Sequence, residues 1–205
     1  MQPLELYIHI PFCVKKCAYC DFLSGPAGEK EKEEYVKMLV DEIRKCPDTV
    51  QNYRVISIFF GGGTPSLLTG EQIERLMDTV REIFTLDEDA EITMEMNPGT
   101  VTEEKLRKYR QAGVNRLSIG LQSVNDEELR LLGRIHTYEE FREAYHLARA
   151  NGFSNINVDL ISAIPGQTVE SWRRTLEQVM ALSPEHISAY SLILSLIHIS
   201  EPTRP

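Results

Sequence analysis

Apolar positions along the chain recur with two different periods. Segments in which apolar and polar residues alternate, or that are apolar throughout, predict strands at 4–10, 55–60, 91–96, 116–121, 155–161 and 186–192. Between them, apolar residues recur every three or four positions, which predicts helices at 30–45, 70–84, 103–112, 138–151 and 169–181. Strands that alternate with single amphipathic helices are typical of parallel βα units with right-handed crossovers. The pattern therefore predicts an α/β fold, either an open doubly wound sheet or a barrel.

Capping residues support these helix boundaries. Thr69 and Thr102 each stand immediately before a predicted helix whose first turn is acidic, as N-cap residues do. Gly113 and Gly152 follow the ends of two predicted helices, where a left-handed residue often ends a helix. The boundaries are thus supported independently of the hydrophobic pattern.

Unusual clusters of residues follow four of the predicted strands. A cysteine-rich run follows the first strand. The clusters after the next three strands are Gly61-Gly62-Gly63-Thr64-Pro65, Asn97-Pro98-Gly99 and Gln122-Ser123. Ligands of parallel α/β sheets and barrels bind at the carboxyl ends of the strands. We therefore expect the four clusters to converge on one face of the molecule.

Composition narrows the class of protein. With 205 residues, 42% of them hydrophobic, the chain can bury the core of one domain. A net charge of -9 and scattered basic residues argue against an extended nucleic-acid interface. No apolar run has the length of a membrane span, and the N-terminus lacks the pattern of a signal peptide. We expect a cytoplasmic protein, and in that reducing compartment clustered cysteines are more often metal ligands or redox groups than disulfides.

Three of the four cysteines lie in one short run, Cys-Val-Lys-Lys-Cys-Ala-Tyr-Cys, as Cys13, Cys17 and Cys20. A structural zinc ion or a closed iron-sulfur cluster has four protein ligands, and the remaining Cys46 ends a charged helical stretch with no second metal motif near it. Three thiolates predict a metal centre with one coordination position left for a substrate or cofactor. A structural zinc site completed by a distant ligand, or thiols with no common role, are the alternatives.

Several motifs occur together and in order: Tyr-Ile-His-Ile-Pro-Phe-Cys from Tyr7, the three-cysteine run, and Gly-Gly-Gly-Thr-Pro. Over about residues 4–192 the chain resembles the radical S-adenosylmethionine (radical SAM) superfamily, and within it the oxygen-independent coproporphyrinogen III oxidase-like group. The resemblance implies a partial (β/α)6 barrel with helices outside, and a 4Fe-4S cluster on Cys13, Cys17 and Cys20. It also implies that S-adenosylmethionine occupies the open iron and is cleaved reductively to a 5'-deoxyadenosyl radical.

The same resemblance implies which side chains contact S-adenosylmethionine. They are Tyr7, Tyr19, Gly62, Gly63, Thr64, Glu95, Gln122, Arg134 and Asp159. The glycine-rich loop would receive the amino group of the cofactor, although without the resemblance it is equally compatible with a simple turn. Tyr19 would lie near the adenine. For both tyrosines, the alternative to a cofactor contact is a purely structural role in packing.

Four polar side chains complete this expected site. Glu95 and Gln122 would be polar contacts at neighbouring strand ends, and Arg134 would meet the carboxylate of the cofactor in a fork geometry. Asp159 lies in an otherwise apolar strand, where a carboxylate needs partners or a cavity, and the resemblance assigns it to the ribose hydroxyls. The alternative for Glu95 and Gln122 is an ordinary solvent-exposed strand end, and the alternative for Arg134 is a surface residue without a ligand. His9 is equally compatible with a buried, hydrogen-bonded histidine and with a role beside the cluster.

Two departures from the family pattern bear on activity. The decarboxylase branch has a further cysteine two positions after the third of the motif, where this chain has Phe22, and it has an extension before the first strand, whereas the first strand is predicted here from residue 4. Both features instead resemble the heme chaperone branch, which binds heme and delivers it to respiratory hemoproteins. The expected partners are S-adenosylmethionine, heme or a porphyrinogen, heme-recipient proteins and an electron donor. Coproporphyrinogen III oxidation is the alternative function.

The last residues differ from what the resemblance predicts. Residues 194–205 resemble the in-frame translation of a sequencing adapter, and the alternative is a native tail that extends the sixth strand. We expect a radical SAM core at 1–193 with its cluster loop at 13–20, a non-native tail, and a missing C-terminal domain. Heme would then be a ligand of the intact protein, because the heme-binding motif of that branch lies in the missing region.

Overall fold

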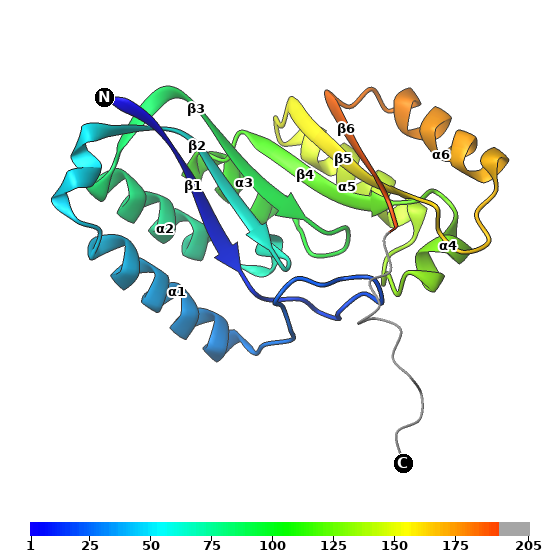
Figure 1. The fold of residues 1–205 in the computed structure, drawn as a ribbon, viewed down its shortest axis with the longest axis horizontal. Coiled ribbons are helices and arrows are strands. Elements are labelled where there is room, and N and C mark those ends of the chain that lie inside the picture. The colour runs from blue at the N-terminus through cyan, green and yellow to red at the C-terminus, as the bar shows by residue number, and fades with distance from the viewer. Residues whose placement is uncertain (193–205) are drawn as a thin grey trace, which may run out of the picture.

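Six parallel strands form a single sheet in chain order, β1-β2-β3-β4-β5-β6, in the computed structural model, which describes residues 1–192 (Figure 1). The strands are β1 (Gln2–Ile10), β2 (Tyr53–Gly62), β3 (Thr85–Met96), β4 (Arg116–Gln122), β5 (Asn155–Ser162) and β6 (His186–Ser191). The sheet curls into a partial (β/α)6 barrel, as predicted. The expected non-native tail at 194–205 lies outside the described residues.

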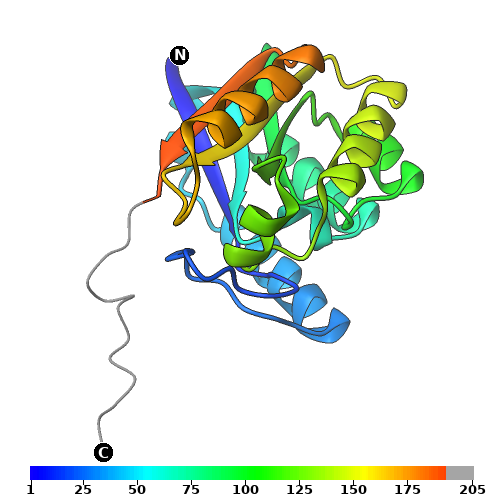
Figure 2. The same cartoon turned by 90° about the vertical axis from the view of Figure 1, so that its right-hand side faces the viewer.

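Helices connect consecutive strands of the sheet, as is typical of parallel strands joined by crossover connections. They are α1 (Glu29–Arg44), α2 (Gly70–Ile83), α3 (Glu103–Ala112), α4 (Asp126–Leu131), α5 (Tyr138–Ala150) and α6 (Val169–Ala181), with 3-10 turns at Asp48–Asn52 and Pro65–Leu67. Figures 1 and 2 show the helices on the convex side of the curled sheet. None of the helices within residues 1–192 has both the length and the apolar composition needed to cross a bilayer.

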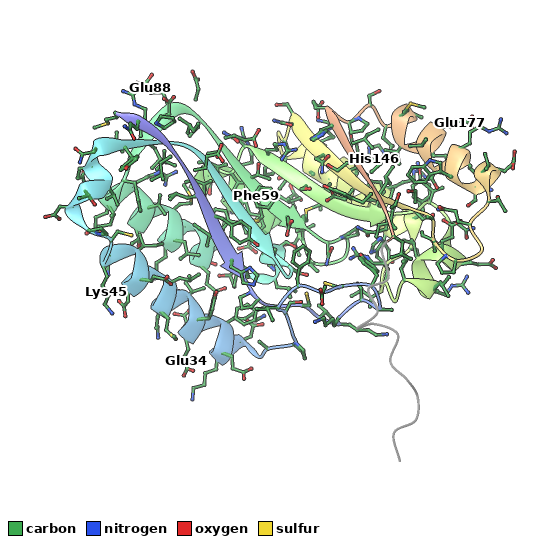
Figure 3. All side chains as sticks on the ribbon, in the orientation of Figure 1. Glu34, Lys45, Phe59, Glu88, His146 and Glu177 are labelled. Carbon is green, nitrogen blue, oxygen red and sulfur yellow. The ribbon has the colours of Figure 1, made fainter. Side chains whose placement is uncertain are left out.

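Alternation along the strands separates an apolar face from a polar one. On β2, Ile58 and Phe60 are buried beneath the helices. Phe59, labelled in Figure 3, lies between them in sequence and belongs to the opposite, concave face. The concave positions of β4 and β5 include Ser118, Gln122 and Asp159, so the face that carries no helix is largely polar.

The predicted helix caps are present. Thr69 Oγ1 accepts a hydrogen bond from Gln72 N at 3.2 Å, and Thr102 Oγ1 accepts one from Lys105 N at 3.3 Å. Gly113 ends α3 in the left-handed conformation, with φ of 105°. These local signals therefore set the boundaries of α2 and α3 correctly.

Among the strands and α-helices, β3 and α4 differ most from the sequence prediction. β3 begins at Thr85 rather than at 91, because Thr85 and Leu86 pair with the start of β2 before the register shifts. α4 was not predicted. It has only six residues, too few to show a helical period, and its N-cap is Asn125, whose side chain accepts a hydrogen bond from Glu127 N.

Candidate cofactor site

The cysteine loop runs from the end of β1 across the carboxyl ends of the strands (Figure 1). Backbone hydrogen bonds join it to the glycine-rich loop after β2: Gly63 N donates to Ile10 O at 2.8 Å, and Thr64 N donates to Phe12 O at 2.6 Å. A Cβ atom on Gly63 would lie 2.5 Å from Phe12 O. Gly63 therefore allows the two loops to pack backbone against backbone.

A cavity of about 380 Å³ opens beside these loops, at the carboxyl ends of the strands. Eight predicted contact residues and all three loop cysteines line it: Cys13, Cys17, Cys20, Tyr19, Gly62, Gly63, Thr64, Glu95, Gln122, Arg134 and Asp159. Residues that follow β1, β2, β3 and β4 all contribute to its wall. The expected convergence of the strand-end clusters on one face is thus confirmed.

Two of the cysteine sulfurs receive hydrogen bonds from other elements. Thr64 Oγ1 lies 3.5 Å from Cys13 Sγ, and Arg134 Nη1 lies 3.7 Å from Cys17 Sγ. Among the described residues, no three His, Cys, Asp or Glu side chains are placed to hold a single metal ion. Each thiolate of a cluster binds its own iron, so three thiols around one cavity fit a cluster that keeps one iron open.

Asn97, just after β3, was not among the predicted contacts, although it belongs to a cluster that the sequence had indicated. Its Nδ2 donates to Thr64 Oγ1 at 2.9 Å, and its Oδ1 accepts from Arg134 Nη2 at 2.8 Å. Arg134 Nη2 also donates to Gly120 O at 2.7 Å. The position of Asn97 at a strand end was the available signal, and only the fold shows its partners.

Glu95 faces the cavity from the end of β3. Its Oε2 accepts a hydrogen bond from Gly62 N at 3.0 Å. Burial raises the pKa of Glu95 from 4.5 to about 7, the Gly62 hydrogen bond opposes this shift, and the charge of Asp159 adds to it. A carboxylate in this setting gains free energy from a cationic ligand that neutralises it.

Two buried polar atoms of the cavity residues have no partner within the described chain, namely Gln122 Oε1 and Arg134 Nε. Gln122 also adopts a φ of 70°, which is uncommon for a residue with a side chain. Buried polar atoms are almost always paired, so such atoms at a cavity are expected to meet a ligand. Together with the three thiols, they fit a cluster and a polar cofactor that carries an amine and a carboxylate.

Asp159 is held in place by its neighbours on the concave face. Ser118 Oγ donates to Asp159 Oδ2 at 2.8 Å, and Asn157 Nδ2 donates to Asp159 Oδ1 at 2.9 Å. Ser188 Oγ in turn donates to Asn157 Oδ1 at 3.0 Å. The expectation that this carboxylate needs partners is confirmed, and its side chain also lines the cavity.

The two tyrosines of the motif lie in different places. Tyr19 lines the cavity and packs against an apolar cluster that includes Leu132 and Ile161; burial raises its pKa. Tyr7 is 58% exposed, stacks on Phe59 with ring centroids 6.1 Å apart, and is not among the residues that line the cavity. The structure therefore brings Tyr19, but not Tyr7, together with the other predicted contacts.

His9 occupies a defined place beside the glycine-rich loop. Its Nδ1 lies 3.1 Å from Tyr7 Oη, and its Nε2 lies 3.2 Å from Leu23 O. A Cβ atom on Gly62, whose φ is 110°, would lie 2.4 Å from the His9 ring. His9 is thus a hydrogen-bonded histidine packed beneath the loop, and Gly62 leaves room for its ring.

Comparison with known proteins agrees with these features. The family model described as Radical SAM superfamily matches residues 7–179. The chain is 46% identical over 195 residues to the heme chaperone HemW of Escherichia coli, covering 95% of this chain and 52% of that protein. It is 39% identical over 209 residues to the oxygen-independent coproporphyrinogen-III oxidase-like protein HemZ of Bacillus subtilis, covering 98% and 41% respectively. The chain thus spans about half the length of these curated relatives.

A solved structure shows the same architecture. The coproporphyrinogen III oxidase HemN of Escherichia coli, a radical SAM enzyme, superposes with a TM-score of 0.86 and 37% sequence identity over 94% of this chain and 44% of that one. The superposition agrees with the curled sheet and the strand order described above. The chain belongs to the radical SAM superfamily and is a HemN-like member of it.

Proposed function

We propose that Cys13, Cys17 and Cys20 hold three irons of a 4Fe-4S cluster and that S-adenosylmethionine occupies the cavity beside it. This proposal is supported by three thiols on one cavity wall and by unpaired buried atoms of Gln122 and Arg134. When bound, the two groups supply one-electron reductive cleavage of a sulfonium. The reducing cytoplasm, which we propose as the compartment, would keep the thiols available as ligands.

The chain's own residues would bind and orient the cofactor. The carboxylate of Glu95, held by the Gly62 N–H, offers acceptors to an amino group, and its charged form becomes more favourable once that cation is present. Arg134 suits a carboxylate, because its guanidinium lines the cavity and its Nε has no hydrogen-bond partner among the described residues. Asp159, already held by Ser118, offers acceptors to the ribose hydroxyls. Tyr7 remains a proposed contact from family resemblance alone.

We further propose that the protein serves in heme delivery as a heme chaperone. The observation that carries this proposal is the 46% identity to the heme chaperone HemW across 95% of the chain. Phe22 adds to it: this side chain is 61% exposed and lines the cavity at the position where the decarboxylase branch has a further cysteine. Heme, heme-recipient proteins and an electron donor would be the partners of the intact protein.

Anaerobic incubation with coproporphyrinogen III, S-adenosylmethionine and a reductant tests this proposal. We expect the reconstituted chain to form no protoporphyrinogen IX above a cluster-free control, while E. coli HemN, run in parallel, converts the substrate. Efficient conversion by this chain would refute the chaperone proposal. Heme titration followed by Soret absorbance complements this assay, with E. coli HemW as the positive control.

The oxidase is the second candidate function. Its support is the solved HemN structure, which superposes on nearly the whole chain at 37% identity. An enzyme of this type would use the polar concave face, including Ser118 and Asn157, as part of a substrate site. Conversion of the porphyrinogen by this chain would favour the oxidase over the chaperone, because only the oxidase consumes the substrate.

A further inference from the structure

A continuous chain of hydrogen bonds connects two of the loop cysteines through three residues that come from other elements. Cys13 Sγ is contacted by Thr64, Thr64 by Asn97, Asn97 by Arg134, and Arg134 contacts Cys17 Sγ. The four distances are 3.5, 2.9, 2.8 and 3.7 Å. Asn97 is the middle residue of this series, since two hydrogen bonds separate it from each sulfur.

The chemistry of arginine determines the direction of each bond. A guanidinium group has donors and no acceptor, so the Asn97 atom facing Arg134 must be the carbonyl oxygen. The amide nitrogen of Asn97 therefore faces Thr64 and donates to its hydroxyl oxygen. With that oxygen already accepting a hydrogen bond, the Thr64 proton is directed to Cys13 Sγ.

The backbone of Asn97 is itself well held. Its carbonyl oxygen accepts from Thr100 Oγ1 at 2.7 Å, and its N–H donates to Ser66 Oγ at 3.3 Å. A Cβ atom on Gly120 would lie 3.1 Å from Asn97 Oδ1 and 3.2 Å from Arg134 Nη2. The surroundings thus leave the amide and the guanidinium just enough space to meet.

We propose that Asn97 is a positioning residue that aims two hydrogen bonds, from Thr64 and Arg134, at the sulfurs of Cys13 and Cys17, and thereby raises the reduction potential of the cluster. This inference rests on the cluster proposed above. Reduction adds negative charge to the cluster and its thiolates, and a hydrogen bond to a ligating sulfur stabilises that charge. Asn97 acts through Thr64 and Arg134, the two side chains that it holds in place.

The test is a redox titration of the reconstituted protein followed by electron paramagnetic resonance, with iron per chain measured in parallel. Thr64→Val removes the donor to Cys13 at nearly constant volume, and Asn97→Asp redirects the Thr64 proton to the introduced carboxylate. We expect each variant to lower the reduction equilibrium constant about tenfold, or 59 mV for one electron. In the Thr64→Val background, Asn97→Asp should have a smaller effect, because both act on one bond.

Two controls make the outcome decisive. Thr79→Val removes a buried hydroxyl whose one hydrogen bond among residues 1–192 goes to Arg75 O within α2, and it should leave the potential unchanged. Thr64→Ser keeps the hydroxyl and should retain the wild-type potential. Wild-type iron content with unchanged potentials in Thr64→Val and Asn97→Asp would overturn the inference, as would loss of the cluster in both Thr64→Val and Thr64→Ser. A wild-type chain that takes up no cluster would overturn the proposed function as well.

Discussion

Arg134 Nη1 lies 3.7 Å from Cys17 Sγ, although 117 positions separate the two residues in the chain. The segment after α4 reaches the cysteine loop at a second point, where Ala18 N donates to Leu132 O at 3.1 Å. The loop that carries the thiols is therefore held against the segment after α4 as well as against the glycine-rich loop after β2. This contact gives the first prediction.

Arg134→Lys should make Cys17 more reactive in the cluster-free chain. A lysine ammonium cannot keep the hydrogen bonds to Asn97 and Gly120 while it also reaches the sulfur. Loss of one such bond, about 1.4 kcal/mol, corresponds to a roughly tenfold increase in the rate of iodoacetamide labelling at Cys17. Mass spectrometry of the labelled peptides measures this rate.

Two controls accompany that experiment. Arg130→Lys changes an exposed arginine of α4 and should leave labelling of Cys17 unchanged. Cys46, in the segment after α1, reports global opening in the same sample. Equal acceleration of Cys17 and Cys46 would show that Arg134 acts on overall stability rather than on the loop.

Glu95→Gln should change the pH dependence of stability. The pKa of Glu95 is raised from 4.5 to about 7, so the folded state binds this proton more tightly than the unfolded state does. Its contribution to stability is complete below about pH 4.5 and is lost as the pH rises through 7. We expect the variant to be more stable than the wild type at pH 8, by at most about 3 kcal/mol, and the difference to shrink toward pH 4.5.

Urea unfolding at pH 5 and pH 8 checks this sign. Glu88→Gln is a matched control, because Glu88 is exposed on the same strand, β3, and is labelled in Figure 3. Parallel stability curves for the Glu95 variant and the wild type would contradict the predicted proton linkage.

Gly62→Ala should destabilise the chain more than Gly99→Ala. Both glycines have positive φ, 110° and 79°, so both substitutions carry backbone strain of about 1 kcal/mol. Only at Gly62 would the new Cβ also overlap the His9 ring, at 2.4 Å, which adds about 1–3 kcal/mol. A Cβ on Gly99 would meet nothing within 4 Å.

Urea denaturation midpoints measure the difference between these two variants. Combining Gly62→Ala with His9→Ala should recover part of the loss, because it removes the ring that the new Cβ would meet. Equal destabilisation by the two single glycine substitutions would rule out the steric explanation.

Glu128→Ala should unfold at a lower urea concentration than Glu127→Ala. The buried Glu128 carboxylate accepts hydrogen bonds from Ser123 Oγ at 2.6 Å, from Gln167 Nε2 at 2.9 Å and from Ser171 Oγ. Its removal leaves these donors without their acceptor at a cost of about 3 kcal/mol. Removal of the exposed side chain of Glu127 should lower the free energy of unfolding by less than about 0.5 kcal/mol.

Because Ser123 follows Gln122 directly, the same substitution is expected to weaken S-adenosylmethionine binding. Equilibrium dialysis of the reconstituted protein measures this effect, with the Glu127 variant as the control. A Glu128 variant as stable as the Glu127 variant would show that the buried hydrogen bonds contribute little.

Local patterns in the sequence were sufficient for most of the fold. The two hydrophobic periods located every strand and five of the six helices, and the Thr69 and Thr102 caps placed two helix starts correctly. α4 was missed because six residues are too few to display a period of 3.6. The early start of β3 was missed because it depends on pairing with β2, which no local pattern reports.

For the candidate site, too, the sequence indicated the residues but not the contacts between them. The motif spacing and the strand ends identified the cysteines and the glycine-rich loop, and the family resemblance identified most of the polar residues that line the same cavity. They did not show that Asn97 joins Thr64 to Arg134, that His9 packs beneath Gly62, or that Tyr7 lies away from the cavity wall. Those relationships depend on side-chain direction across the curled sheet.

The sequence by itself thus determined the order of strands and helices and the chemistry available at the strand ends, because backbone periodicity and capping act over a few residues. Only the tertiary structure decided which of those groups meet. Arg134 reaches Cys17, and Glu95 lies half-buried beside Gly62 with a raised pKa, because the curl of the sheet brings distant strand ends within hydrogen-bond range and removes part of their surface from solvent.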